Sequence, residues 1–309
     1  MDALSKKASW PRFFLVLASA TILTSLFLFL GTPLLRALRN VYGSWKYWIS
    51  GVLITAAMLV AFPGAVIYAF LLLSLWVTIG LYQEFEERGH GTFWAACLSV
   101  LLGSSLVILG PSIVAHTLKL DLSTLLKESF EQLLQQLSSG RSLKELGISA
   151  EGIVGQLPSM LIVVHVMSLA FALMLDRRMA QLFGLRYEKI ASEMKLLDFK
   201  VPDFFIWLTM FSFLFSFVKV GPGWTSVVSL NVFNVMMGIY FFQGLAVLEV
   251  GFLAFRIGSF VRLLIYVLVV GQLFFLLSLV GVIDYWVDFR RRLKKWRAKE
   301  KSRNNGENV

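Results

Sequence analysis

Residues 47–82 form an uncharged stretch of 36 residues, YWISGVLITAAMLVAFPGAVIYAFLLLSLWVTIGLY. A single transmembrane helix needs about 20 apolar residues to cross about 30 Å of hydrocarbon, so this stretch is too long for one ordinary span. Pro63-Gly64 lies near its centre, and such a pair is typical of a turn. The stretch therefore predicts a tight hairpin of two short transmembrane helices, with a broken or re-entrant helix as the alternative.

The whole chain has the composition of a membrane protein. Of its 309 residues, 57% are hydrophobic and 16% are charged, and the mean hydropathy is +0.74. Soluble domains carry about 25% charged residues. The composition excludes a soluble protein and a disordered one, and the single cysteine, Cys97, excludes a disulfide scaffold.

Further uncharged runs predict an all-α, polytopic transmembrane bundle of about eight spans. Besides the hairpin within 47–82, the expected spans are 13–35, 92–116, 153–175, 202–218, 227–248 and 260–283. The run 13–35 is longer than the apolar core of a cleavable signal peptide, about 7–15 residues, which predicts a retained anchor. We expect an N-terminal half at 1–116, an extramembrane segment at 117–152, a C-terminal half at 153–288 and a basic tail at 289–309.

The segment 117–152 has the pattern of an amphipathic helix. Ser123 is a candidate N-cap, and Leu126, Phe130 and Leu133 fall on one face, while Gly140 ends the pattern. Such a helix could lie on the membrane surface or cover neighbouring spans, and a simple linker is an equally good interpretation.

The distribution of basic residues predicts the orientation of the chain in the membrane. Beyond Val287 there are nine basic residues against three acidic ones, so the tail supplies +6 of the net +10. Basic segments next to a span favour the cytoplasmic side and anionic lipid headgroups, so we expect a cytoplasmic C-terminus and no nucleic-acid partner. With eight spans, however, the six basic residues of 176–202 fall on the opposite side, and the prediction gives priority to the tail.

The seventh span carries the most informative polar residues. Asn231, Asn234, Glu249 and Arg256 fall along one helical stripe. Ionisable residues in a span face a partner or a cavity, so the stripe is a candidate lining of a substrate cavity. Alternatively, the asparagines join helices and the charged residues reach the interface. His165, alone in the fifth span, is a further cavity candidate, although a buried packing histidine is the more frequent case.

The end of the eighth span predicts a partner or headgroup site. Asp284 and Asp288 share a helix face, and Asp288 can pair with a basic residue one turn later. The basic residues assigned to this site are Arg290, Arg291, Arg292, Lys294 and Lys295. An interface anchor with charge pairing at the helix end is the plainer interpretation.

Motifs for catalysis and cofactors are absent from the sequence. It contains no phosphate-binding G-x-x-x-x-G-K-[ST] loop, no H-E-x-x-H, no G-x-S-x-G and no cysteine–histidine cluster. We therefore expect no ATPase activity by that route, no metal and no cofactor, and we assign no catalytic residues.

Three motifs carry a resemblance. The ending G-V-I-D-Y-W-V-D-F-R at 281–290, the tetrapeptide Gln243-Gly244-Leu245-Ala246, and Phe199-x-x-Pro202 resemble the YybS-like family of predicted bacterial membrane proteins of unknown function. The resemblance covers roughly the last 110 residues and implies a bacterial cytoplasmic membrane location without an assigned reaction. The family is similar at fold level to the substrate-binding subunits of energy-coupling-factor transporters, and no binding residue is carried over.

These observations give a leading hypothesis and two competitors. The first is a small-molecule substrate-binding or transport component without its own ATPase, driven by a partner or an ion gradient. The second is a membrane scaffold that recruits a membrane or cytoplasmic protein through its basic C-terminal segment. An intramembrane enzyme is the weakest, because the sequence shows no paired catalytic carboxylates and no nucleophile–base pair.

Overall fold

The structure is a computed structural model that describes residues 10–117, 149–185, 199–218 and 223–306, with a few isolated positions between 119 and 132. Throughout these residues the regular structure is helical, which confirms the predicted all-α fold. The chain divides into two compact units, Met1–Glu193 and Met194–Val309.

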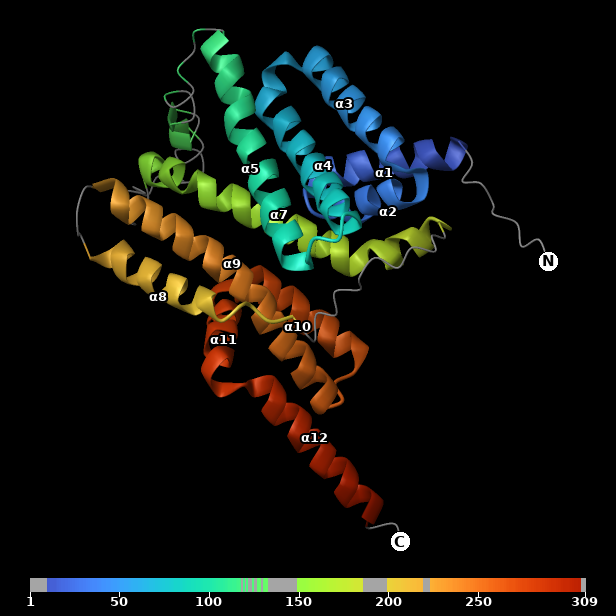
Figure 1. Cartoon of the computed structure of the whole chain (residues 1–309), viewed down its shortest axis with the longest axis vertical. Helices are drawn as coiled ribbons and strands as arrows, with labels where there is room; N and C mark the ends of the chain where they lie inside the picture. The colour runs from blue at the N-terminus through green and yellow to red at the C-terminus, as the bar shows by residue number, and fades with distance from the viewer. Residues whose placement is uncertain are drawn as a thin grey trace, which may run out of the picture. The chain divides into compact units, whose positions relative to one another are not determined.

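Unit 1 is a bundle of apolar helices (Figure 1). Its elements are α1 (Trp10–Phe27), α2 (Thr32–Tyr42), α3 (Ser44–Ala61), the 3-10 turn η1 (Pro63–Ala65), α4 (Val66–Glu87), α5 (Thr92–Thr117) and α7 (Ala150–Leu182). Ser149 caps α7 by accepting a hydrogen bond from the backbone N of Gly152 over 3.1 Å. Most of the predicted amphipathic helix between α5 and α7 lies outside the described residues.

The helices α3 and α4 form the predicted hairpin, with η1 at Pro63-Gly64 as its turn. Tyr47 near the start of α3 donates from its hydroxyl to the carbonyl of Trp76 over 2.6 Å, and the Trp76 indole donates to the carbonyl of Tyr47 over 3.1 Å. A Cβ at Gly51 would meet the Trp76 ring at 2.7 Å. The two helices are therefore antiparallel and closely packed, as the sequence predicts.

The predicted first span at 13–35 is wrong in its second half. α1 ends at Phe27, Leu28 takes a left-handed conformation with φ +43°, and α2 starts at Thr32 with Pro33 in its first turn. Proline favours a helix start because its missing N–H is not needed there. Hydropathy could not show this break, because both sides of it are uncharged.

α2 folds back along α1. A Cβ at Gly31 would overlap Thr24 and the carbonyl of Ala20, while at the other end the Tyr42 ring packs edge-on against Phe13 with centroids 4.9 Å apart. The two ends of this helical pair, Phe13 and Tyr42, thus lie at the same end of unit 1. Every residue of α2 from Thr32 to Arg39 is buried.

α4, α5 and α7 form the centre of unit 1. α5 runs antiparallel to α4, because a Cβ at Gly103 would overlap the Thr78 side chain and one at Gly110 would overlap Phe70. α7 contacts α4 through His165. Small residues at such contacts let helix backbones approach closely in lipid.

Unit 2 consists of α8 (Phe204–Phe217), α9 (Gly223–Ala254), α10 (Ser259–Gln272), α11 (Phe274–Val287) and α12 (Phe289–Gly306). The predicted continuous span at 260–283 is wrong, because Leu273 separates α10 from α11. The break follows Gly271-Gln272, and glycine is a poor helix former. Asp288, with φ +50°, then ends α11 and redirects the chain into α12.

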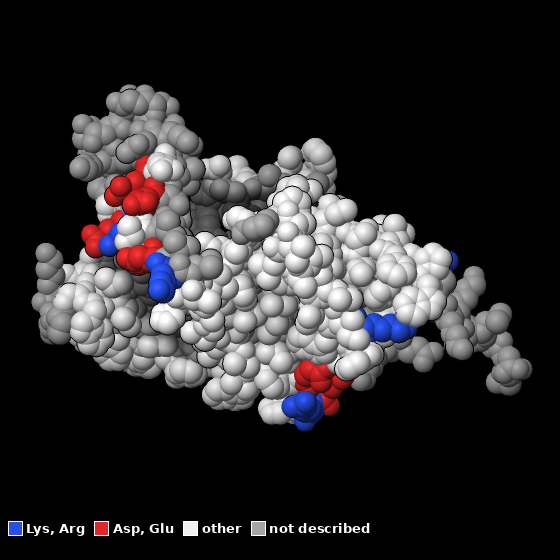
Figure 2. Space-filling model, turned by 90° about the horizontal axis from the view of Figure 1, so that it is seen from above, with Lys and Arg blue, Asp and Glu red and all other residues white. Residues whose placement is uncertain are grey.

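The described helices suit a lipid environment. Six of them are long and apolar enough to cross a membrane, and α8 and α11 are shorter apolar helices, in line with about eight spans. Large apolar side chains are exposed, such as Trp207 at 58% and Phe217 at 71% on α8. Figure 2 shows a face with few charged side chains. The protein is therefore a multi-pass integral membrane protein.

Candidate functional site

Two glycines bring α9 and α11 into backbone contact in unit 2. A Cβ at Gly244 would overlap the carbonyl of Leu277, and a Cβ at Gly281 would overlap the carbonyl of Tyr240. Neither position can therefore hold a larger residue without separating the helices. This crossing places the neighbouring side chains of Gln243 and Asp284 beside each other.

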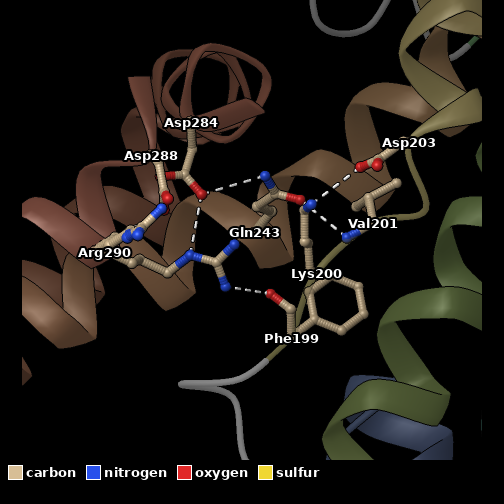
Figure 3. A network of polar contacts seen from close by, with 9 residues as sticks. Phe199, Lys200, Val201, Asp203, Gln243, Asp284, Asp288 and Arg290 are labelled. Atoms are coloured by element: carbon tan, nitrogen blue, oxygen red, sulfur yellow. Dashed lines mark hydrogen bonds and ion pairs between the residues drawn. The ribbon is translucent and has the colours of Figure 1, made fainter. Parts of the chain in front are cut away.

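Gln243, Asp284 and Arg290 form a buried polar network at this crossing (Figure 3). Asp284 Oδ2 accepts hydrogen bonds from Gln243 Nε2 over 3.3 Å and from Arg290 Nε over 3.0 Å. The Asp284 side chain is 1% exposed and that of Arg290 is 12% exposed. Asp284 Oδ1 is buried and finds no hydrogen-bond partner among the described residues.

The same network holds the segment before α8. Gln243 Oε1 accepts from the backbone N of Val201 over 3.0 Å, and Arg290 Nη1 donates to the carbonyl of Phe199 over 2.6 Å (Figure 3). These residues are not in a helix, so their backbone groups lack intrahelical partners, and the two side chains supply them. The three sequence motifs at 199–202, 243–246 and 281–290, which carry the family resemblance, therefore contact one another in this network.

The predicted headgroup residues consequently divide into two groups. Asp284 and Arg290 are engaged inside the protein, whereas Asp288 is exposed and accepts from the backbone N of Arg291 over 3.4 Å. The remaining assigned residues, Arg291, Arg292, Lys294 and Lys295, are exposed on α12.

The α9 stripe is distributed along its helix. Asn231 donates from Nδ2 to the carbonyl of Val227 over 2.8 Å, within its own helix. Asn234 lies 15 positions before Glu249, which corresponds to about 22 Å along the axis. The structure therefore does not bring the two asparagines together with Glu249.

Glu249 has partners on α10. Its Oε1 lies 3.4 Å from Arg262 Nη1, and its Oε2 accepts from the Tyr266 hydroxyl. Arg262 also donates from Nε to the carbonyl of Ile257 over 2.8 Å. Arg256, the last member of the stripe, is exposed beyond the end of α9 with φ +53°.

His165 is one of the buried polar residues in the core of unit 1. We call four of these residues the polar seam: Ser74 on α4, Ser104 on α5, and His165 and Ser168 on α7. The Nδ1 of His165 is 2.7 Å from the carbonyl of Leu161, and its Nε2 is 2.8 Å from Ser74 Oγ. Because a carbonyl only accepts, Nδ1 carries the proton, and a neutral imidazole then accepts at Nε2. Ser74 Oγ also lies 2.6 Å from the carbonyl of Leu71, so its one hydrogen serves two acceptors.

Two buried hydroxyls, one on α5 and one on α7, find no hydrogen-bond partner among the described residues. Ser168 lies one turn after His165 on α7, and Ser104 follows Gly103, at the point where α5 packs on Thr78 and Ser74. Ser168 is 0% exposed and Ser104 is 4% exposed. An unsatisfied buried hydroxyl costs about 1–3 kcal/mol, so these groups call for a polar partner.

A charged cluster, which the sequence did not predict, closes one end of unit 1. Arg36 on α2 lies 3.2 Å from Glu86 and 3.5 Å from Asp176, and its side chain is 1% exposed. Arg39 lies 2.8 Å from Glu84 and 3.2 Å from Glu87. The cluster joins α2 to α4 and α7 and shows that these helix ends lie at the same end of the unit.

A signal for this cluster was present in the sequence. Arg36 and Arg39 are one turn apart, and the apolar run of α4 ends in three carboxylates. Their pairing connects residues about 50 positions apart, which helical periodicity does not report.

The fold and these buried groups define a multi-pass α-helical membrane protein. A family model described as "Predicted membrane protein (DUF2232)" matches residues 13–285. The match covers most of the 309 residues, so the chain belongs to this family. No curated protein and no solved structure matches the chain.

Proposed function

We propose that the protein is a small-molecule binding or transport component of the membrane. The observation that carries this proposal is the polar seam around His165, where the Ser104 and Ser168 hydroxyls have no partner among the described residues. The seam lies within α4, α5 and α7, which are all candidate membrane spans. An ionisable residue within a span, such as His165, faces the bundle interior or a cavity and is by default a candidate for a substrate or ion pathway.

The chemistry of the seam favours a neutral polar solute. Its groups are hydroxyls and an imidazole, and the charged cluster of Arg36 and Arg39 lies apart from it at the end of the unit. A solute that carries hydroxyl or amide groups could both donate and accept here. Because the sequence lacks a phosphate-binding loop, energy for transport would come from a partner protein or an ion gradient.

Ligand-induced thermal stabilisation of the purified protein tests the proposal. A library of neutral polar solutes is screened with the wild type, and each hit is repeated with Ser168→Ala and Ser104→Ala. Ser112→Ala on α5 is the matched control, because the Ser112 hydroxyl is bonded to Ile108 of its own helix. Loss of the shift in the first two variants alone supports the proposal, and equal shifts in all variants contradict it.

The α9 stripe is a second location for the same activity. Glu249 is a partly buried carboxylate with partners on α10, and Arg256 is exposed at the helix end. The same assay with Asn234→Leu and Glu249→Leu distinguishes the two locations. Shifts that survive these variants but disappear with Ser168→Ala assign binding to the seam.

We further propose that the protein resides in the cytoplasmic membrane with both termini in the cytoplasm. The Phe13–Tyr42 contact at the open end of α1 and α2 supports this topology, because α3, α4, α5 and α7 would then make four crossings and residue 185 would lie on the side of the N-terminus. The connection 186–198 has 13 residues, six of them charged, and is too short and polar to cross. The hydrogen bond from Arg290 to the carbonyl of Phe199 supports the same side for the start of α12.

This topology removes the conflict in the charge distribution. The basic tail and the six basic residues of 176–202 now share one side, in agreement with the positive-inside rule. On the opposite side, residues 118–149 contain four basic and four acidic residues and therefore carry no net charge.

A membrane scaffold is the second candidate function. The observation that favours it is α12, on which five basic residues are exposed: Arg291, Arg292, Lys294, Lys295 and Arg297. Deletion of residues 289–309 followed by crosslinking and affinity capture tests this role. A partner set that is unchanged by the deletion counts against it.

A further inference from the structure

We propose that α12 is an interfacial helix that binds the anionic phospholipid headgroups of the surrounding bilayer, while Arg290 is its structural anchor and not a lipid contact. The headgroup-binding residues would be Arg291, Arg292, Lys294, Lys295 and Arg297. The inference rests on the scaffold candidate, because it names the partner of the same segment, and it is independent of solute binding in unit 1.

Arg290 is held inside the protein by Asp284 and the backbone of Phe199. Its Nε lies 3.0 Å from Asp284 Oδ2, and its Nη1 donates to the carbonyl of Phe199 over 2.6 Å. Its side chain is 12% exposed. These bonds use two nitrogens of the guanidinium inside the protein and fix the first turn of α12 against the end of α11 and the segment before α8.

The basic side chains that follow Arg290 on α12 are exposed. Arg291, Arg292, Lys294, Lys295 and Arg297 are all exposed. The described part of α12 that carries them contains no acidic residue before Glu300. A dense positive charge on a helix favours a surface of dense negative charge, which an anionic leaflet provides.

The same helix also carries an apolar stripe. Phe289, Leu293 and Trp296 are spaced four and three residues apart, so they share one face. The Trp296 ring packs against Phe255 beyond the end of α9, with centroids 5.4 Å apart. A helix with tryptophan, leucine and phenylalanine on one face and lysine and arginine on the others is typical of the membrane interface.

α12 follows closely after an apolar helix in the chain. Only Asp288 separates it from α11, an apolar helix that ends with Val287. Figure 1 shows α12 following α11 after a short connection. The basic face therefore begins where an apolar helix ends, and the headgroups of the same bilayer are the anions nearest to it.

The experiment uses the full chain in a zwitterionic detergent. Thermal unfolding is measured with added phosphatidylglycerol, with phosphatidylcholine, and with soluble glycerol phosphate. Three proteins are compared: the wild type, a neutral variant with Arg291, Arg292, Lys294, Lys295 and Arg297 changed to Gln, and the charge-preserving variant R291K/R292K/R297K as the matched control. A fourth arm repeats the wild type with phosphatidylglycerol at about 0.5 M salt, where exposed charges are screened.

We expect phosphatidylglycerol, but not the other two additives, to raise the midpoint of the wild type and of the charge-preserving variant by several degrees. The neutral variant should lose this shift, and high salt should reduce it by at least half. Equal shifts with the two lipids, an undiminished shift in the neutral variant, or an equal shift with glycerol phosphate would overturn the proposal.

Two further outcomes distinguish headgroup binding by α12 from protein docking and from a folding defect. If the midpoint does not respond to lipid charge and α12 crosslinks to a cytoplasmic protein, α12 is a protein-docking helix and the proposal is overturned, although the scaffold function stands. If the neutral variant does not fold, the wild-type lipid and salt arms alone decide, because a shift without lipid preference or salt dependence contradicts headgroup binding.

Discussion

Arg290 on α12 reaches back six residues to donate to Asp284 on α11, and the same guanidinium holds the carbonyl of Phe199, 91 residues earlier in the chain. One side chain thus connects the last apolar helix, the basic helix and the segment that opens α8. Because Asp284 is buried, this pair should control the stability of unit 2.

We predict that breaking this pair destabilises the protein strongly. Arg290→Gln leaves the Asp284 carboxylate buried without its cation, and the loss of one partner of a buried pair costs about 3–5 kcal/mol. Asp284→Asn removes the charge that requires compensation, so Asp284→Asn combined with Arg290→Gln should be less damaging than the sum of the single variants. Thermal unfolding in detergent measures all three, and strictly additive losses would contradict the coupling.

The glycine crossing gives a second prediction. Gly244→Ala or Gly281→Ala introduces a Cβ that overlaps the backbone of the facing helix, and overpacking of this kind costs about 1–3 kcal/mol. Gly251→Ala is the control on α9, because no atom lies within 4 Å of its Cβ position. That variant should be neutral or slightly stabilising, since alanine favours the helix by about 1 kcal/mol over glycine. Equal effects at the three sites would sink this explanation.

A third prediction concerns the charged cluster of unit 1. Arg36→Gln removes the cation between Glu86 and Asp176, and Arg36→Lys should restore little, because a single ammonium lacks the geometry of a guanidinium that contacts two carboxylates. We expect a loss of more than about 2 kcal/mol in the free energy of unfolding for Arg36→Gln. Arg88→Gln is the control, because Arg88 is exposed near the same helix end.

The topology gives a fourth prediction, measured by cysteine labelling of intact cells in a Cys97→Ser background. Cysteines at His90, Arg186 and Arg303 should react only after the membrane is permeabilised, and those at Phe62 and Lys219 should react before. Labelling of His90 and Arg303 from opposite sides would contradict the proposed cytoplasmic position of α12 relative to the end of α4.

The sequence alone predicted the elements that depend on local properties. The hairpin of α3 and α4 follows from an uncharged run that is too long for one span and has Pro63-Gly64 near its centre, and α5, α7 and α9 follow from equally plain apolar runs. The breaks at Leu28 and Leu273 could not be predicted from charge, because no charged residue lies next to either of them.

The candidate site was less predictable, since its contacts depend on helix packing. Asp284 was predicted as a partner or headgroup residue and Gln243 was noted only as part of a motif. Their contact with each other depends on Gly244 and Gly281, which let the two helix backbones touch. His165 was predicted as a cavity candidate, with a buried packing histidine as the alternative, but its partner Ser74 lies 91 positions away in the sequence. The ion pairs of Arg36 and Arg39 were not predicted, because the expected span at 13–35 placed both residues in a loop after the span and not on a helix that packs against α4 and α7.

The return of α2 also bears on how the chain enters the membrane. A helical pair that starts and finishes on one leaflet adds nothing to the parity of crossings, so every later helix inserts in a direction that does not depend on it. Deletion of residues 1–42 should therefore leave α3 and the later helices in the same orientation in the membrane. The deletion would instead reduce stability, because it removes the contacts of Arg36 with α4 and of Thr32 with α7.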